Sequence, residues 1–129
     1  MNIKFNEEST KRIVEGYYKK HEDFECYLKI NCQHELTPSF GRFAVPNTRP
    51  KLSFVLDGKL GVNGVEEAVS TSVTQDEVSN AFKMMLEEDG YSVDELTFDY
   101  GEDKNGLEFR GVVVKMSTKK KVKVKINGD

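Results

Sequence analysis

Apolar and polar residues alternate one by one between residues 24 and 33. The apolar positions are Phe24, Cys26, Leu28, Ile30 and Cys32, and the positions between them hold Glu25, Tyr27, Lys29, Asn31 and Gln33. Successive side chains of a β-strand point to opposite faces. The alternation therefore predicts an antiparallel strand with one face in the core and the other toward water or a partner.

Two other segments repeat their apolar residues at helical spacing. The first helix is predicted to begin near Asn6, a residue type that caps helices, and to end at Lys19–Lys20. Its apolar stripe consists of Ile13, Val14, Tyr17 and Tyr18. The second helix is predicted to begin with a capping box of Thr74 and Glu77 and to end before Gly90. Its apolar face consists of Val78, Ala81, Phe82 and Met85.

The remaining apolar runs predict five further strands. They start at Leu52–Leu56 and continue with residues 65–73, 91–100, 107–117 and 121–126. Asp57-Gly58 and Asn63-Gly64 are both candidates for the tight hairpin turn between the first two of these strands. The element order is then α-β-β-β-α-β-β-β, which predicts a single α+β domain over residues 1–129. We expect an antiparallel sheet of about six strands that packs two helices on one face.

The segment from Thr37 to Lys51 interrupts this regular pattern. It contains all three prolines and two of the four arginines, and two phenylalanines flank one of these arginines. Irregular segments of this length are uncommon in compact domains and are often binding loops. The sequence therefore points to this segment first as a candidate binding surface.

Charge is distributed unevenly along a chain whose formal net charge is −3. Residues 87–103 contain eight acidic residues and no basic one, and residues 115–125 contain six lysines and no acidic residue. These blocks are two solvated faces, or else the lysines attract an anion or an acidic partner. A duplex nucleic acid and a membrane are not expected as partners. With no signal peptide and two cysteines, we expect a cytoplasmic protein.

The residue types needed for catalysis are not arranged in a known pattern. Cys26 and Cys32 share a strand face but lie about 20 Å apart at 3.3 Å per residue, too far for one metal ion. The two histidines, His21 and His34, lie at element edges among charged neighbours, and no nucleophile motif or phosphate-binding glycine loop is present. The sequence therefore predicts no enzyme, no metal and no cofactor.

Arginines next to phenylalanines form the better candidate site. An arginine presents a planar fork that suits phosphate, and a phenylalanine ring offers a surface on which a base can stack. The predicted ligand-binding residues are Phe40, Arg42, Phe43, Asn47, Arg49, Phe109 and Arg110. The alternative is that Phe40 and Phe43 anchor the loop on the core while the arginines pair with nearby acidic residues.

Three segments carry a resemblance to a known group of proteins. They read ESTKRIVEGYYKK, TQDEVSNAFKMMLEEDG and LEFRGVVVKM, and the order of elements around them covers the whole chain. This chain resembles the phage anti-defence proteins that defeat the Thoeris system. The resemblance implies an oligomer that binds a cyclic ADP-ribose isomer or a cyclic oligonucleotide without cleaving it, in the cytoplasm of the host cell. Tyr17 and Tyr18 are also consistent with a homo-oligomer, since adjacent helix positions do not easily face one core.

Two readings from other classes remain open. In one, the acidic segment 87–103 mimics nucleic acid, as in a protein-binding inhibitor of the anti-CRISPR type. Such a complex would weaken steeply with salt, whereas a stacked nucleotide in a closed pocket would depend on salt only moderately. In the other, the chain is a small structural domain that binds no small ligand.

Overall fold

The computed structural model describes residues 1–37 and 47–119. They form two helices and six strands in an α+β arrangement, as the sequence predicted. The elements are β1 (Asn2–Phe5), α1 (Glu7–Glu22), β2 (Glu25–Thr37), β3 (Asn47–Val62), β4 (Val65–Val73), α2 (Gln75–Glu88), β5 (Tyr91–Asp103) and β6 (Gly106–Thr118). The sequence did not predict β1, and the strand predicted over residues 121–126 lies outside the described residues.

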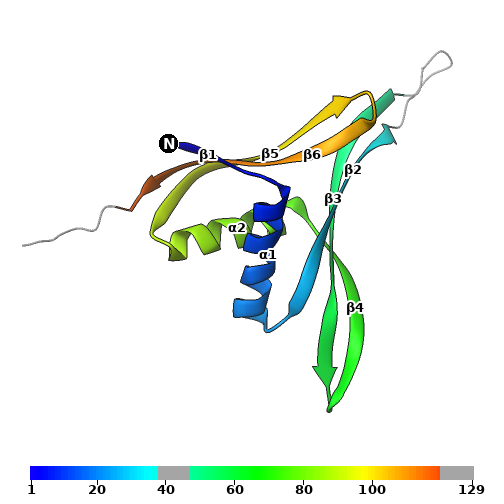
Figure 1. The fold of residues 1–129 in the computed structure, drawn as a ribbon, viewed down its shortest axis with the longest axis vertical. Helices are drawn as coiled ribbons and strands as arrows, with labels where there is room; N and C mark the ends of the chain where they lie inside the picture. Colours follow the sequence, from blue (N-terminus) through cyan, green and yellow to red (C-terminus); the bar gives the residue numbers. More distant parts are fainter. Residues whose placement is uncertain (38–46, 120–129) are drawn as a thin grey trace, which may run out of the picture.

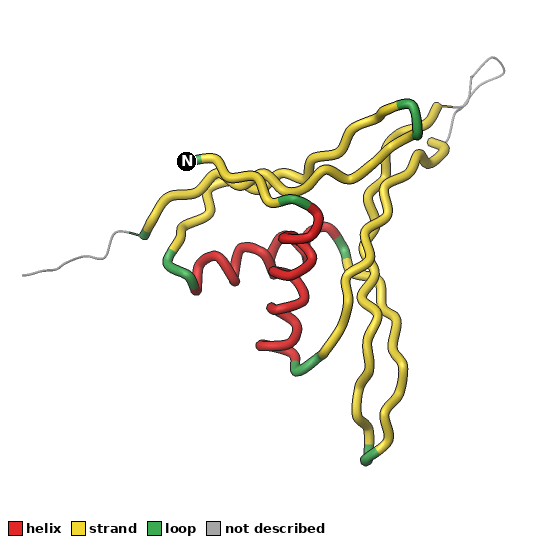
Figure 2. The backbone as a smooth tube through the Cα atoms, in the orientation of Figure 1, coloured by secondary structure: helices red, strands yellow, loops and turns green. Residues whose placement is uncertain are grey.

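The α+β class is as predicted and all pairings are antiparallel, but the strands form two separate three-stranded sheets instead of the single sheet that the sequence predicted. One sheet has the order β1-β6-β5 and the other has the order β2-β3-β4. The two sheets meet at an angle, and both helices lie inside that angle (Figures 1 and 2). Each sheet therefore has an inner face that packs on the helices and an outer face that is exposed.

Three of the four helix ends lie where the sequence indicated, whereas α1 continues past the predicted end at Lys19–Lys20 to Glu22, where Asp23 follows in the left-handed conformation. The side chain of Asn6 accepts a hydrogen bond from the Ser9 amide at 2.8 Å and caps α1. The capping box of α2 is complete, because Glu77 Oε1 accepts from the Thr74 amide at 2.9 Å and Thr74 Oγ1 accepts from the Glu77 amide at 3.1 Å. Gly90 follows α2 with a φ of +95°, the left-handed conformation that stops a helix.

The register of β3 with its neighbours decides between the two turn candidates. Asn63 and Gly64, with φ values of +52° and +78°, form the tight turn between β3 and β4. Asp57 and Gly58 instead lie inside β3, opposite Tyr27 and Cys26 of β2. Strand β3 therefore runs on past the point where the sequence suggested a turn.

The last part of the β3–β4 hairpin extends beyond the rest of its sheet. Strand β2 begins at Glu25, which pairs with Lys59, so residues 60–67 have no partner on the β2 side. We call residues 60–67 the β3–β4 arm; it projects past the end of α1 (Figure 1). Leu60, Val62 and Val65 lie on the arm and are exposed.

The core fills the angle between the sheets. Phe5 and Phe82 pack edge to face with ring centroids 5.0 Å apart, and Phe54 packs on Phe98 at 5.4 Å. The inner positions of both sheets and the apolar faces of both helices contribute to one continuous cluster. Because one core unites both sheets, the described chain packs as a single unit.

Candidate functional site

Three of the predicted ligand-binding residues lie outside the part of the chain that the structure describes. These are Phe40, Arg42 and Phe43. Asn47 is the first residue of β3, where its backbone pairs with Thr37 of β2. The two flanks of segment 38–46 are thus opposite one another at the end of a thirteen-residue strand.

Arg49 lies near this end of β3, on the outer face of its sheet. Its guanidinium donates to Glu35 of β2 at 2.8 Å, and Lys51 approaches the other oxygen of the same carboxylate at 3.3 Å. Hydrogen bonds from Arg49 and Lys51 hold the pKa of Glu35 below its ordinary value. Arg49 is therefore an exposed basic group whose present partner is a carboxylate, as in the alternative reading of the sequence.

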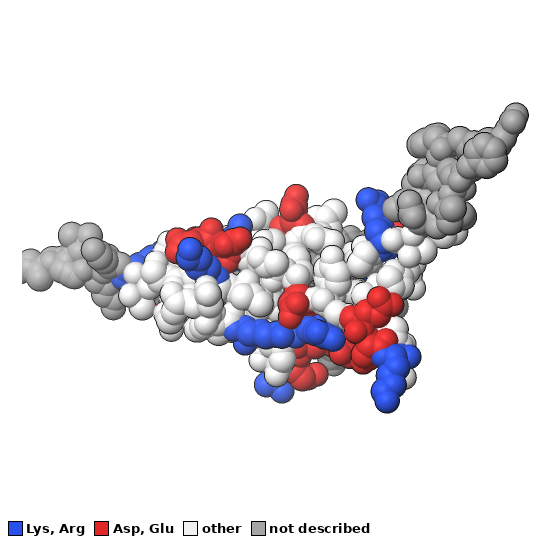
Figure 3. Space-filling view, turned by 90° about the horizontal axis from the view of Figure 1, so that it is seen from above, with Lys and Arg blue, Asp and Glu red and all other residues white. Residues whose placement is uncertain are grey.

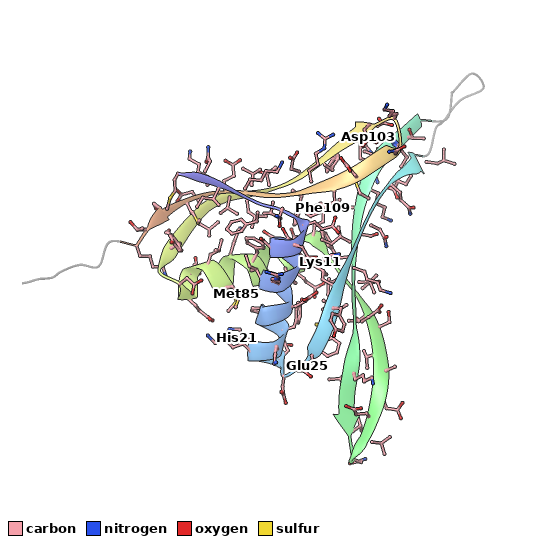
Figure 4. All side chains as sticks on the ribbon, in the orientation of Figure 1. Lys11, His21, Glu25, Met85, Asp103 and Phe109 are labelled. Atoms are coloured by element: carbon pink, nitrogen blue, oxygen red, sulfur yellow. The ribbon has the colours of Figure 1, made fainter. Side chains whose placement is uncertain are left out.

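Phe109 and Arg110 are adjacent in β6 but have different environments. Phe109 is 8% exposed and belongs to the core, and Figure 4 shows it inside the angle between the sheets. Arg110 is exposed, lies over Gly101 of β5, and has Glu108 as a neighbour at 3.6 Å. The core position of Phe109 leaves its ring little surface on which a base could stack.

Arg49 and Arg110 belong to different sheets and lie near different carboxylates. Arg49 contacts Glu35 and Arg110 contacts Glu108. Arg110 is the extra residue of a β-bulge, because Asp99 pairs with Gly111 and Tyr100 pairs with Phe109. Among the described residues, the structure does not bring the predicted arginines into one phosphate-binding cluster.

The ends of the two long hairpins do converge. Nε2 of His34 in β2 lies 3.2 Å from a carboxylate oxygen of Glu102 in β5. Figure 4 shows Asp103, at the end of β5, beside the ends of β2 and β3 that flank segment 38–46. Two large apolar residues near this junction are exposed, Leu36 at 72% and Tyr100 at 42%. The sequence did not predict this junction, because no local pattern indicates which hairpins will meet.

A separate hollow of about 770 Å³ lies between α1 and the base of the β3–β4 arm. Its lining includes four carboxylates and two lysines, from Glu15, Lys19, Glu25, Asp57, Lys59 and Glu66. Lys19 already pairs with Glu25 at 3.2 Å. With acidic groups in excess, this hollow disfavours a phosphate-bearing ligand.

The cysteines have the properties of core residues. Burial, together with the nearby charge of Glu15, raises the pKa of the Cys26 thiol to about 11, and burial also raises the pKa of Cys32. Both thiols are therefore protonated at neutral pH, the poorly nucleophilic form. Within residues 1–37 and 47–119, no three His, Cys, Asp or Glu side chains lie close enough together to hold a metal ion.

The acidic segment 87–103 does not form one continuous acidic face. Glu88 pairs with Lys20 and His21 of α1, each at 2.6 Å, and Asp99 pairs with Lys4 of β1 at 2.9 Å. On the face of the molecule seen in Figure 3, basic and acidic side chains are interspersed. This mixing weakens the comparison of the segment with a nucleic acid backbone.

Comparison of the chain with protein-family models, with curated proteins and with solved structures gives no match. Neither helix of the described chain has the length and apolar character needed to cross a membrane.

Proposed function

We propose that this chain is a non-enzymatic, homo-oligomeric phage anti-defence protein that sequesters a nucleotide-type immune signal. The ligand would be a cyclic ADP-ribose isomer or a cyclic oligonucleotide, bound intact. The resemblance to the Thoeris anti-defence proteins suggests this class of ligand. We place the binding site at the end of the β2–β3 hairpin.

The observation that carries the proposal is the unbroken pairing of β2 with β3. It extends from Glu25 opposite Lys59 to Thr37 opposite Asn47. Segment 38–46, which contains Arg42 between two phenylalanines, therefore starts and ends at opposing positions of a regular ladder. The two flanks of the proposed site, Thr37 and Asn47, are already paired with each other, and flanks that need no ordering on binding favour affinity.

Arg49 can exchange its present partner for a phosphate at little cost. The side chain of Arg49 is 67% exposed, and exposed ion pairs contribute only about 0–1 kcal/mol to stability. A phosphate offers the same guanidinium a bidentate partner with more negative charge. We therefore expect an anion to compete with Glu35 for Arg49.

The described titratable groups also support binding rather than chemistry. His21 and His34 each face a carboxylate, and no hydrogen bond joins either of them to a serine or cysteine of the described residues. Nucleophilic catalysis requires a nucleophile within reach of its base. The two histidines therefore take part in surface contacts with carboxylates, not in a nucleophile–base pair.

Native mass spectrometry of the purified protein tests the proposal directly. The protein is incubated with cyclic ADP-ribose isomers and cyclic dinucleotides, and any captured ligand is released by heat and identified. We expect an oligomer carrying a chemically intact nucleotide. A protein that captures none of these signals, or that returns a hydrolysed product, would contradict the proposal.

Calorimetry with arginine variants tests the position of the site. A sequestering protein needs a nanomolar dissociation constant, about −12 kcal/mol. Arg49→Ala removes a charge-assisted interaction of about 1.5–3 kcal/mol and should weaken binding roughly 10- to 150-fold. Arg12→Ala is the matched control, because Arg12 is an exposed arginine of α1 whose partner is Glu8 at 3.7 Å. If both variants bind equally well, the site is elsewhere.

A further inference from the structure

Among the strands that the structure describes, β4 is a free edge of its sheet. It pairs with β3 on one side only, and in Figures 1 and 2 it lies on the outside of the sheet, away from the helices. Seven of its nine residues are exposed. A free edge presents unpaired backbone N–H and C=O groups that can pair with another strand, so proteins usually protect such edges.

The other strand edges of the described chain are protected or short. On β2, helix α1 lies alongside, and Glu15 Oε2 accepts the hydrogen bond of the Leu28 amide at 2.8 Å. Strand β1 has only four residues, and β5 is interrupted by a register shift between Val93 and Glu95. Strand β4 has none of these protections: it is nine residues long, contains no proline or lysine, and pairs without a bulge.

The strand register identifies which backbone groups of β4 point outward. The amide of Leu28 donates to Glu15, so the backbone N–H and C=O groups of Leu28 point away from β3. Leu28 and Leu56 are therefore a non-hydrogen-bonded pair, and the backbone groups of Leu56 point toward β4. Leu56 pairs with Thr71, which therefore bonds inward to β3. The direction of the backbone N–H and C=O groups alternates from one residue to the next. The residues of β4 whose backbone groups point outward, away from β3, are therefore Glu66, Ala68, Ser70 and Ser72.

This pattern is self-complementary in one register. If two copies of β4 pair antiparallel about Val69, Glu66 faces Ser72 of the second copy and Ala68 faces Ser70. All four outward residues then form hydrogen-bonded pairs. On the inner face, Val69 faces its own copy, and Glu67 faces Thr71. No two carboxylates are opposite one another, so the like-charge repulsion that destabilises strand pairs is avoided.

We propose that β4 is a homodimer interface in which two copies of this chain pair antiparallel about Val69. The result is a continuous six-stranded sheet with the order β2-β3-β4-β4-β3-β2. Pairing extends the inner apolar row, because Val65 of each copy faces Val73 of the other. This interface gives the oligomer of the proposed function a definite contact, but it does not depend on nucleotide binding.

A proline at position 68 tests the edge without damaging the hairpin. The amide of Ala68 points outward, so Ala68→Pro removes a hydrogen bond to the second copy and none to β3. Two symmetry-related bonds are lost in each dimer, and we expect the dissociation constant of the dimer to rise about tenfold or more. Ala68→Ser keeps the amide and serves as the control. Sedimentation measures the dimer, and thermal unfolding verifies that both variants remain folded.

Cysteine cross-linking tests the register independently. Val69→Cys should form an intermolecular disulfide, because this residue faces its own copy across the symmetry axis. Thr71→Cys alone should not, since the two copies of position 71 lie about 13 Å apart, beyond the reach of a disulfide. A mixture of Glu67→Cys and Thr71→Cys should cross-link again. The wild-type chain, with Cys26 and Cys32, gives the background.

Two results would overturn the interface. One is a wild-type protein that remains monomeric at the highest concentration that stays in solution, as expected if β4 binds a strand of a different protein. The other is an oligomer that Ala68→Pro does not weaken and Val69→Cys does not cross-link. Ligand capture is measured separately, so a dimer without nucleotide would contradict the proposed function and leave the interface intact.

Discussion

Replacing Gly58 by alanine is expected to destabilise the protein, although its neighbour Asp57 makes the pair resemble a turn. Gly58 lies within β3, where β2 approaches closely. An added Cβ would overlap the carbonyl oxygen of Glu25 and lie 2.7 Å from a ring carbon of Phe24 and 2.9 Å from Cβ of Cys26. Contacts this short force the two strands apart.

The magnitude follows from two opposing effects. Overpacking in a well-packed region costs about 1–3 kcal/mol. Restricting the unfolded chain by Gly→Ala returns about 0.4–1 kcal/mol where the native backbone accepts alanine. At Gly58 one clashing atom belongs to the backbone and cannot rotate away, so we expect a net loss of roughly 1–2 kcal/mol.

Gly61 provides a matched control in the same strand. A Cβ at position 61 would meet no atom within 4 Å, and its φ is not in the left-handed region. Gly61→Ala should therefore be neutral or stabilise the protein by up to about 1 kcal/mol. The two variants make the same chemical change three positions apart.

Equilibrium unfolding in urea, followed by far-UV circular dichroism, measures both variants. The slope of the free energy of unfolding with denaturant should remain unchanged, because each variant exposes the same surface on unfolding. The reasoning is refuted if Gly58→Ala is as stable as Gly61→Ala. That result would mean that β2 does not pass over Gly58 as described.

Three further predictions concern the core, the cysteines and the effect of pH. Phe82→Ala removes a fully buried ring that packs on Phe5, and it should cost about 3–5 kcal/mol in urea unfolding; a loss below about 1 kcal/mol would contradict this packing. Because the pKa of Cys26 is raised to about 11, its thiol should react with iodoacetamide at pH 8 far more slowly than it does in urea, as mass spectrometry can show. The hydrogen bond from Lys20 lowers the pKa of Glu88 below its ordinary value of 4.5, so this stabilisation is present above that pH and is lost as the pH falls through the folded pKa. Glu88→Gln should therefore flatten the acid side of the stability–pH curve, and an unchanged curve would rule this pair out as its cause.

The helices were predictable because their signals are local. The Asn6 cap and the Thr74–Glu77 box each act over three residues, so the sequence determines them without reference to the rest of the fold. Gly90 stops α2 for the same reason: glycine accepts the left-handed conformation at low cost. Tertiary contacts only had to position these helices.

The strands were predicted less completely because their ends depend on pairing. Strand β1 has four residues and acquires its structure by pairing with β6, which also requires a glycine at position 111 to let the Phe5 carbonyl approach. The continuation of β3 past Gly58 depends on its pairing with β4. Neither contact leaves a pattern within its own segment.

The candidate site shows the same limit. Phe109 looked available for stacking because it is next to an arginine, but strand alternation turns its ring into the core. Arg49 looked free because its partner, Glu35, lies fourteen residues away in the chain. The register of β2 with β3 places this carboxylate opposite the arginine, and composition alone cannot give that register.

The binding site and the homodimer interface proposed above lie at a strand end and at a strand edge. Catalysis needs several titratable groups that converge in a water-excluded place. Here the described ion pairs are spread over the surface as separate, exposed contacts such as Lys4–Asp99 and Lys29–Asp57. Within residues 1–37 and 47–119, the features that lack a partner are instead backbone groups on the edge of β4 and apolar side chains on the arm. Among the described residues, Glu15 accepts a hydrogen bond from an amide on the edge of β2, whereas the edge of β4 has no partner strand. The proposed homodimer would pair this edge, and Ala68→Pro is therefore the first experiment.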